Sequence, residues 1–485
     1  MTKDKKSQGG LTVKKEEKFS EWFTQIIQKA ELADLRYNVK GFLVFQPWSV
    51  LCMEKMYSYM EKALQKNQHK PYWFPTLIPE SNLKKESTHI SGFTPEVFWV
   101  THGGNTKFEE KLALRPTSET AFYNMFSLWI RSYKDLPFKA YQRANIFRYE
   151  TKATRPFLRS REFHWIETHC AHATEEDAIK QVHEDMETTK EVLGGTYCLP
   201  FIFFERPSWD RFPGAHRTFA SDVLNPDGKV IQQPSTHIIN QKFAKAFNIK
   251  FKDKDGKEKY VWTTCYGPAI SRIFASIIAV HGDNKGLRFP WEIAPLQVVI
   301  VPIGENEKIK KKAEELKRKI QNFASVEIDY TDKRPGEKFN YWEMKGVPIR
   351  IDLGEKDLKK KKITLFRRDL DKKELVNEKD VLKRIKKISK EVTKNLKEKA
   401  QKLFRGKIKD VKTKKEIKKI IEEGGIARCN FCSVKKEGES CAEIIEKRMD
   451  AEVRGTSLNE KEKAKGKCII CGKPATEIVY IAKAY

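Results

Sequence analysis

The pattern of apolar and charged residues changes at one point in this 485-residue chain, between Pro290 and Pro295. Before that point, short apolar segments alternate with turns rich in Gly and Pro, which predicts a mixed, mostly antiparallel sheet with a few helices. After it, apolar strands alternate with charged helices, which is typical of a small α/β domain with a partly parallel sheet. A third region, from about residue 406, carries most of the cysteines. The length allows two or three domains, each with a core of its own.

Periodicity places individual elements within these regions. Apolar residues at helical spacing over 18–33, namely Phe19, Trp22, Phe23, Ile26 and Ile27, predict an amphipathic helix. Further helices are expected at 175–191, 305–323 and 381–404. Strands are expected at 41–47, 72–78, 111–115, 140–149, 161–167, 201–205, 297–302, 326–330, 348–353 and 363–367. Residues 1–18 are polar and charged, and we expect them to form a disordered basic tail.

The net charge restricts the class of partner. Lys and Arg number 94 against 66 Asp and Glu, a formal net charge of +28. Such an excess favours a polyanion such as nucleic acid, because bound basic side chains release the counterions condensed on phosphates. A charged, solubilising surface would give the same composition, so the charge alone leaves both interpretations open.

The distribution of apolar residues argues against a membrane protein. No segment reaches the ~18–20 apolar residues that cross a bilayer. The longest apolar run, at 270–280, is interrupted by Ser271, Arg272 and Ser276. The first residues lack the apolar core of a signal peptide. We therefore expect a cytoplasmic protein that does not enter a membrane.

The cysteines predict a metal site near the end of the chain. Nine are present, and five of them lie within the last 60 residues: Cys429, Cys432, Cys441, Cys468 and Cys471. Two C-x-x-C pairs supply four thiolates for a tetrahedral structural zinc, and their spacing alone selects Cys429, Cys432, Cys468 and Cys471. The region contains no histidine, which argues against a catalytic zinc.

Three arginines on apolar or aromatic-flanked segments are candidates for binding phosphate: Arg148, Arg159 and Arg272. Arginine is seldom buried without a partner, and its planar fork matches phosphate oxygens. The alternative is a structural ion pair with Glu150, Glu162 or Glu167. The chain has neither a G-x-x-x-x-G-K-[ST] loop nor a strand-linked G-x-G-x-x-G, so side chains would have to hold any nucleotide.

Two pairs of polar residues complete the expected site. Arg148 and Glu150 are two apart on a predicted strand, so they face the same side and together suit a phosphate, a magnesium-bound triphosphate or an adenine edge. Thr117 and Glu119 also share a side, where they could hold an ammonium group. A cation-binding pair next to an arginine is what a pocket that activates amino acids requires.

These segments resemble the signature motifs of class II aminoacyl-tRNA synthetases. Residues 41–47 look like motif 1, the dimer-interface element; 147–150 with the following loop look like motif 2; and 267–272 look like motif 3. The Arg-Pro-Thr-Ser-Glu-Thr string at 115–120 resembles the amino-acid-binding signature of prolyl and threonyl enzymes. Residues 99–104 and 147–172 resemble prolyl enzymes of archaeal and eukaryotic type, and the resemblance extends from about residue 18 to Tyr485.

The resemblance implies a fold class and four regions. The tail at 1–18 is followed by an α+β catalytic domain at 19–292, built on a mostly antiparallel sheet. An α/β anticodon-binding domain at 293–404 and a small zinc-binding C-terminal domain at 405–485 complete the chain. The family pattern also places Cys441 rather than Cys429 among the zinc ligands, beside Cys432, Cys468 and Cys471. It further suggests that the segment ending at Tyr485 folds back towards the active site.

The resemblance also implies roles for individual residues. Arg148 and Arg272 would be catalytic. The implied proline-binding residues are Thr117, Glu119, Arg148, Trp165, Glu167, His169, Ser235 and His237. The implied ATP-binding residues are Arg148, Glu150, Arg159, Gln232, Ser235 and Arg272. For His237, a core histidine satisfied by its neighbours is the competing interpretation. Glu343, Lys345, Arg367 and Arg368 are candidates for anticodon contact, or else exposed surface charges.

The implied activity is ATP-dependent ligation of proline to tRNA(Pro) by a homodimeric enzyme. Proline would attack the α-phosphorus of ATP, bound with Mg²⁺, to give prolyl-adenylate, and a ribose hydroxyl of the tRNA would then take the prolyl group. Positioning and charge neutralisation would drive both steps, without a protein nucleophile. Two alternatives remain. Altered residues at 216–221 and 234–240 are compatible with a synthetase for another amino acid, such as threonine, or with a catalytically silent RNA-binding paralogue.

Overall fold

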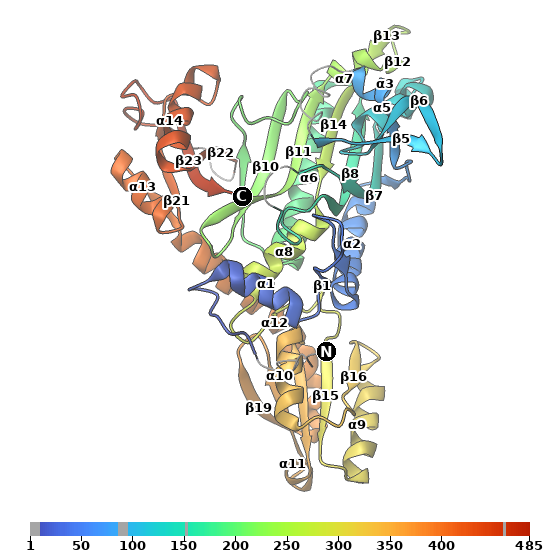
Figure 1. Cartoon of the computed structure of the whole chain (residues 1–485), viewed down its shortest axis with the longest axis vertical. Helices are drawn as coiled ribbons and strands as arrows, with labels where there is room; N and C mark the ends of the chain where they lie inside the picture. The colour runs from blue at the N-terminus through green and yellow to red at the C-terminus, as the bar shows by residue number, and fades with distance from the viewer. Residues whose placement is uncertain (1–9, 86–95, 151–153, 459–461) are drawn as a thin grey trace.

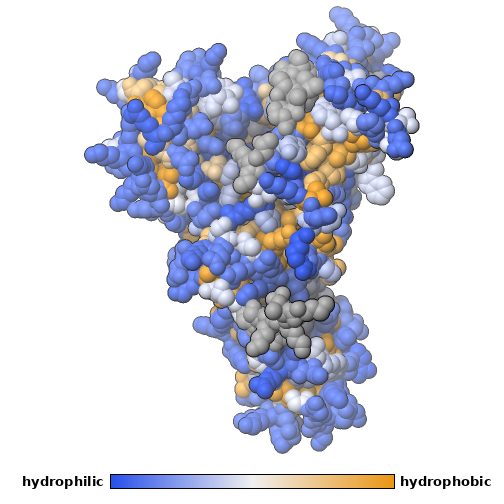
Figure 2. Space-filling view, in the orientation of Figure 1, coloured by the Kyte–Doolittle hydropathy of each residue, from blue (hydrophilic) through white to orange (hydrophobic). Residues whose placement is uncertain are grey.

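A computed structural model describes residues 10–85, 96–150, 154–458 and 462–485. Figure 1 shows three regions: the catalytic region in the upper part, an α/β domain at the lower end, and the C-terminal region at the upper left. The lower domain is predominantly hydrophilic on the face shown in Figure 2, in keeping with its many lysines. None of the helices within the described residues has the length and apolar character needed to cross a bilayer.

One large sheet forms the catalytic region. Its strand order is β3-β7-β8-β14-β11-β10-β9, and every neighbouring pair from β7 to β9 is antiparallel, as the sequence predicts. The strands are β3 (Lys70–Pro71), β7 (Phe138–Phe147), β8 (Glu162–His172), β9 (Ile202–Glu205), β10 (Arg217–Leu224), β11 (Lys229–Asn240) and β14 (Trp262–Gly267). Because side chains alternate along a strand, each strand presents one row of residues to each face of this sheet.

Helices cover one face of the sheet. These are α2 (Pro47–Lys66), α6 (Glu175–Thr189) with the π-helical turn η3 (Lys190–Thr196), and α8 (Ile270–His281). The N-terminal helix α1 (Phe19–Lys29) packs into the same core through the five apolar residues that predicted it. With one face buried in this way, the side chains of the opposite face are available for a binding site.

Smaller elements surround the sheet. The three-stranded sheet β4-β6-β5 consists of Leu77–Pro79, Thr106–Leu114 and Phe98–Gly103. The pairs β1 (Ala33–Asp34) with β2 (Val44–Phe45), and β12 (Lys250–Lys252) with β13 (Glu258–Tyr260), are short. The short helices are α3 (Glu80–Lys84), α5 (Glu119–Trp129), η2 (Tyr133–Asp135) and α7 (Lys242–Ala246).

Two expected strands are shorter in the structure than the sequence suggests. Within the segment 72–78 only Leu77 and Ile78 lie in a strand, β4, and the remainder contains Pro75, which cannot donate to a ladder. Within 41–47, β2 covers two residues before α2 begins at Pro47, a favoured first position of a helix.

The α/β domain has the mixed sheet that the sequence predicts. Its strand order is β16-β15-β17-β18-β19, with β15 parallel to β16 and β17, and the remaining pairs antiparallel. The strands are β15 (Val298–Ile303), β16 (Val326–Ile328), β17 (Ile349–Gly354), β18 (Lys362–Arg367) and β19 (Lys372–Asn377). The helices are α9 (Glu307–Ile320), α10 (Pro335–Lys345), α11 (Glu355–Lys359), η4 (Glu378–Asp380) and α12 (Val381–Gly406).

The C-terminal region extends the catalytic sheet. Strands β20 (Ile408–Asp410), β21 (Ile426–Phe431), β22 (Glu452–Ser457) and β23 (Glu477–Ala484) accompany α13 (Lys414–Glu422), η5 (Lys436–Gly438) and α14 (Glu439–Met449). Because β22 pairs with β9 and β23 pairs with β11, the two regions share one eleven-stranded sheet. The residues at 405–485 are thus joined to the catalytic core by backbone hydrogen bonds.

The expectation of a disordered tail needs correction for its second half. Residues 1–9 lie outside the described residues, but residues 10–18 are bound to the catalytic core. The Lys15 ammonium group is buried and donates to the carbonyls of Gly282 at 2.7 Å and Val280 at 3.2 Å, at the end of α8. Carbonyls at the end of a helix have no partner within it, so a cation stabilises them there.

Candidate active site

A cavity of about 250 Å³ opens on the face of the catalytic sheet opposite α6 and α8. Strands β8, β11 and β14 form its floor, and the first turns of α5 and α8 contribute to its walls. Nine residues selected from the sequence line it: Glu119, Arg148, Trp165, Glu167, His169, Gln232, Ser235, His237 and Arg272. Segments as far apart as residues 119 and 272 therefore meet at one place.

The acidic end of the cavity is built on β8 and on the start of α5. Trp165, Glu167 and His169 alternate along β8, so all three point to the cavity face. Glu119 begins α5, and its carboxylate accepts a hydrogen bond from the Thr117 hydroxyl. The residues Glu119 and Glu167 are both almost fully buried.

Hydrogen bonds keep Glu167 ionised despite its burial. Its carboxylate accepts from Gln142 Nε2 at 2.7 Å, from the Ser118 amide at 3.2 Å and from His169 Nε2 at 3.1 Å. Burial alone would raise the pKa of Glu167, but the hydrogen bonds and the charge of His169 outweigh it and leave the pKa below its ordinary value. A buried negative charge beside Glu119 favours a cationic ligand.

The aromatic wall of the cavity offers polar atoms that lack a partner. Within the described residues, Trp165 Nε1 and His169 Nδ1 are buried and make no hydrogen bond. The Phe122 ring packs on the His169 imidazole at a centroid distance of 4.3 Å and fixes its orientation. Unsatisfied buried donors and acceptors are rare in native proteins and often mark a ligand site.

The basic end of the cavity is formed by arginines. Arg148 directly follows β7 and lies over the rings of Phe163 and Trp165, and its Nε donates to the Pro116 carbonyl at 3.0 Å. Arg272 projects from the first turn of α8, where its guanidinium donates to the carbonyls of Leu158 and Gln232.

A smaller adjoining pocket adds the third arginine. Arg148, Glu150, Arg159 and Arg272 line it together, and Arg159 Nε lies 3.5 Å from Glu150 Oε2. Burial, with further contributions from the like charges of Arg148 and Arg159, lowers the pKa of Arg272 to about 10. The three guanidinium groups therefore crowd one another, which favours an anion between them.

The third side of the cavity is a chain of neutral groups on β10 and β11. Ser235 Oγ and His237 Nε2 share a hydrogen bond of 3.0 Å, and His237 Nδ1 is 3.1 Å from Thr218 Oγ1. Burial, assisted by the charge of Arg206, lowers the pKa of His237 to about 3, so the imidazole is neutral. His237 is satisfied by its neighbours and also lines the cavity, which combines the two interpretations of this residue. Gln232 Nε2 donates to Ser235 Oγ at 3.4 Å.

The sequence reasoning missed other residues of the cavity. Cys265 and Gly267 on β14, and the loop residues Arg211 and Phe212, line it as well. The Cys-Tyr-Gly string before Arg272 could have indicated Cys265 and Gly267, since residues two apart on a strand face the same side. The position of the 210–213 loop depends on long-range packing and has no comparable local signal.

Comparisons with known proteins agree with this geometry. A family model of the class II tRNA synthetase core domain (G, H, P, S and T) matches residues 98–281, one of the anticodon binding domain matches 297–388, and one of the prolyl-tRNA synthetase C-terminal region matches 414–485. Proline–tRNA ligase from Thermofilum pendens is 47% identical, with 99% of this chain and 100% of that protein covered. The enzyme of the same name from Methanobrevibacter smithii is 44% identical, with 97% and 100% covered. The chain belongs to the prolyl-tRNA synthetases.

A solved structure extends this similarity to the fold of the synthetase. Giardia lamblia prolyl-tRNA synthetase in complex with prolyl-adenylate superposes with a TM-score of 0.94 at 38% identity, covering 98% of this chain and 100% of that one. The prediction of the archaeal and eukaryotic type, with a class II core and an anticodon-binding domain, is thereby confirmed.

The structure does not favour the residues expected to contact the anticodon. Lys345, Arg367 and Arg368 of the synthetase are each less than 5% exposed. Arg367 pairs with Asp369 and Glu391, and Lys345 donates to Glu31. The Glu343 and Arg368 side chains also pair within the chain, with Arg350 and Asp283. Contact with a base would require these side chains to leave their present partners, so the anticodon roles stay a prediction.

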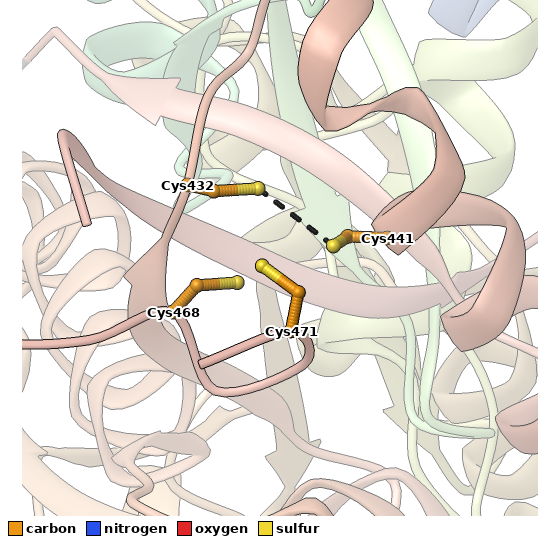
Figure 3. A group of neighbouring side chains, drawn as sticks. All are labelled: Cys432, Cys441, Cys468 and Cys471. Carbon is orange, nitrogen blue, oxygen red and sulfur yellow. Dashed lines mark hydrogen bonds between the residues drawn. The ribbon is translucent and has the colours of Figure 1, made fainter. Parts of the chain in front are cut away.

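Four cysteines of the C-terminal region converge on one point. The sulfurs of Cys432, Cys441, Cys468 and Cys471 lie within 4.8 Å of one another, and Figure 3 shows all four directed inward. Cys441 Sγ is 3.7 Å from Cys432 Sγ. Cys429 lies on β21 and is outside this group, so the geometry favours the family pattern over the spacing.

The C-terminal residue Tyr485 lies beside the smaller pocket, because it contacts Arg159, which lines that pocket. Strand β23 runs parallel to the start of β11, and the Tyr485 carbonyl accepts a hydrogen bond of 3.4 Å from Arg159 Nη2. The Tyr485 hydroxyl donates to Asp227 at 2.5 Å. The suggestion that this segment folds back towards the active site agrees with these contacts.

Proposed function

We propose that this synthetase ligates proline to tRNA(Pro) through a prolyl-adenylate intermediate formed from ATP. The observation that carries the proposal is one cavity with a buried carboxylate pair at one end and three crowded guanidinium groups at the other. Such a cavity is complementary to a cationic amino group bonded, through a carboxylate, to a polyphosphate.

The acidic end would bind the imino group of proline. Glu119, held by Thr117, supplies the negative charge, and Glu167 and His169 close the pocket. The Trp165 ring would pack against the pyrrolidine ring, since it lines the same wall. Arg148 lies between the two ends of the cavity and would bind the proline carboxylate and the α-phosphate at once.

The basic end would bind ATP together with its Mg²⁺. Arg159 and Arg272 face the smaller pocket, where β- and γ-phosphates would lie, and Glu150 is placed for the adenine edge or the metal-bound phosphates. Gln232 and Ser235 would line the adenosine site from β11. The carboxylate then attacks the α-phosphorus in line, and pyrophosphate leaves as the arginines neutralise the developing charge.

The second step needs no further catalytic group from the chain. A terminal ribose hydroxyl of the tRNA attacks the prolyl carbonyl, the bond between that carbonyl and the phosphate oxygen breaks, and AMP leaves with its phosphate held by Arg148. The proton of the hydroxyl passes to a phosphate oxygen of the leaving AMP. The net charge of +28 favours association with a polyanion of this kind.

We further propose a structural zinc bound by Cys432, Cys441, Cys468 and Cys471. Four sulfurs at about 2.3 Å from one ion in a tetrahedron lie about 3.8 Å apart, close to the spacing of Cys432 and Cys441. The ion would tie the end of β21, α14 and the 468–471 turn together. Its contribution is to folding, because four thiolates leave no open position for a substrate.

A cytoplasmic homodimer is the assembly we propose. Exposed apolar side chains gather in one stretch before and within α2: Tyr37, Val39, Val44, Val50 and Leu51. Contiguous exposed apolar residues mark interfaces, and a twofold axis would bury this stretch against its own copy. The nine cysteines form no disulfide, which suits a reducing compartment.

ATP–pyrophosphate exchange across the twenty amino acids tests the assignment. We expect exchange with proline, and exchange with another amino acid but not with proline would refute it. Arg148→Ala should abolish exchange while tRNA binding, measured by filter retention, stays intact. Arg217→Ala is the matched control, because this arginine lies on β10 of the same sheet but pairs with Glu205 instead of lining the cavity.

A further inference from the structure

The C-terminal end of α10, in the anticodon-binding domain, is a point of contact with the catalytic region. Trp48 Nε1 of α2 donates to the Lys345 carbonyl at 2.9 Å. Lys345 Nζ donates to the Ala30 carbonyl at 2.9 Å and to Glu31 Oε2 at 2.5 Å, just after α1. Two separate catalytic segments therefore hold the same residue.

A third catalytic segment meets this turn with no space between the backbones. The Leu287 amide donates to the Met344 carbonyl at 3.0 Å. A Cβ atom on Gly286 would lie 2.3 Å from Met344 Cα, and one on Gly346 would lie 2.7 Å from Leu287. Both glycines also have positive φ, so the contact requires glycine for its space and for its conformation.

An ion pair between a buried arginine and a partly exposed aspartate, whose side chain is 24% exposed, closes the same junction. Arg368, 1% exposed, binds both oxygens of Asp283 at 2.5 and 3.0 Å, and its Nε donates to the Glu343 carbonyl. Arg288 also lies 2.7 Å from Asp283. Burial works to raise the pKa of Asp283, but the two guanidinium groups outweigh it and lower the pKa to about 2. The pair is therefore ionised at any physiological pH.

The junction lies at the end of a helix that begins in the active site. Asp283 is two residues beyond α8, whose first turn carries Arg272. A twelve-residue helix is about 18 Å long. The anticodon-binding domain is thus fixed, through Asp283, to one end of the rigid element whose other end faces the cavity.

We propose that Arg368 and Asp283 are positioning residues for the tRNA-dependent step. This rests on the proposed function. They hold the anticodon-binding domain at one distance and angle from the cavity, so that a tRNA bound by that domain delivers its acceptor end there. The planar guanidinium of Arg368 makes two hydrogen bonds to the Asp283 carboxylate, and such a contact has a specific geometry, which suits a device that fixes orientation. The close backbone contacts at Gly286 and Gly346 and the hydrogen bonds of Lys345 also fix the position of the anticodon-binding domain relative to the catalytic region.

Arg368→Lys tests the proposal, since it keeps the charge but loses the two-pronged contact. We expect ATP–pyrophosphate exchange to stay within about twofold of the parent, because the cavity is untouched. Aminoacylation of full-length tRNA should lose about tenfold or more in kcat/KM. Charging of an acceptor-stem minihelix should not change, because it never reaches the anticodon-binding domain.

Arg350→Lys is the matched control. Arg350 is as buried as Arg368, but it pairs with Glu343 and Asp352 inside its own domain. Glu31→Gln is a second variant whose half-exposed side chain cannot endanger folding, and it should give a smaller loss in the same assay.

A parallel loss of exchange, minihelix charging and tRNA charging in Arg368→Lys would show a general structural role and overturn the proposal. Unchanged charging of full-length tRNA would overturn it as well. A parent enzyme that fails to exchange with proline would instead refute the proposed function, so the two failures are distinguishable.

Discussion

Asp185 of α6 should make the enzyme less stable as the pH rises. Its carboxyl group is 1% exposed and lies under β11, where it accepts from Thr236 Oγ1 at 2.6 Å and from Gln181 Nε2 at 2.9 Å. Burial raises the pKa of Asp185 from 3.8 to about 7, and the two hydrogen bonds oppose it only in part. Thr236 stands between the cavity residues Ser235 and His237, so the group supports the site from behind.

The sign and size of the effect follow from linkage. The folded pKa is above the unfolded one, so the stability from this group is fully present below pH 3.8 and is lost as the pH rises through 7. At about 1.36 kcal/mol per pKa unit, the total loss by pH 8 is about 4 kcal/mol. Between pH 5 and pH 8 the free energy of unfolding should fall by about 2 to 3 kcal/mol.

Asp185→Asn should remove this dependence, because the amide keeps an acceptor for Thr236 and cannot ionise. For a chain of 485 residues, a change of about 2 to 3 kcal/mol shifts the melting temperature by about 2 to 3 °C. The melting temperatures of parent and variant should therefore diverge by about this amount between pH 5 and pH 8, with the variant melting at the higher temperature at pH 8. Differential scanning calorimetry at matched scan rates measures this. A constant difference across the range would refute the reasoning.

The control is the same substitution at Asp222, which is equally buried. Burial works to raise the pKa of Asp222, but Arg206 and Arg454 outweigh it and hold the pKa below its ordinary value. Its stabilisation is therefore fully present across pH 5–8 and is lost only in acid. Asp222→Asn should lower stability by about 3 to 5 kcal/mol at every pH in this window, because it leaves two buried guanidinium groups without a counter-charge.

Three shorter predictions concern the site and the metal. Glu119→Gln should raise the KM for proline in pyrophosphate exchange by about tenfold or more, through loss of the charge opposite the imino group. Arg272→Lys should lower kcat for exchange about a hundredfold, because an ammonium cannot bridge the phosphate oxygens. Cys441→Ser should lose zinc in a metal-to-protein assay, while Cys429→Ser should retain it. Retention in Cys441→Ser with loss in Cys429→Ser would restore the spacing argument.

Much of the cavity follows from local pattern in the sequence. Alternation on β8 places Trp165, Glu167 and His169 on one face without any knowledge of the fold. The helix α1 begins and ends within four residues of its expected bounds, because its apolar spacing is strong. The convergence of Arg148 with Arg272 came from the family resemblance, since 124 residues separate them and no local rule brings them together.

The paired arginines show what the sequence leaves out. Arg206 on the loop after β9 and Arg454 on β22 share Asp222, yet nothing near any of the three residues in the sequence indicates the other two. Arg368 was expected to face RNA, and its partner Asp283 lies 85 residues away. The sequence gives the chemistry of a charged side chain, but the identity of its partner depends on how distant segments pack together.

The difference between these arginines is itself informative about function. The charges of Arg206 and Arg368 are neutralised by the carboxylates of Asp222 and Asp283, each of which accepts two hydrogen bonds from the guanidinium group. Arg272 is instead held by two backbone carbonyls, which orient it without cancelling its charge. Burial, and then its like-charged neighbours, lower its pKa. The fold thus maintains crowded positive charge at the mouth of the cavity at a cost in free energy. An anionic substrate relieves that repulsion on binding, and this relief grows as negative charge develops on the phosphates in the transition state.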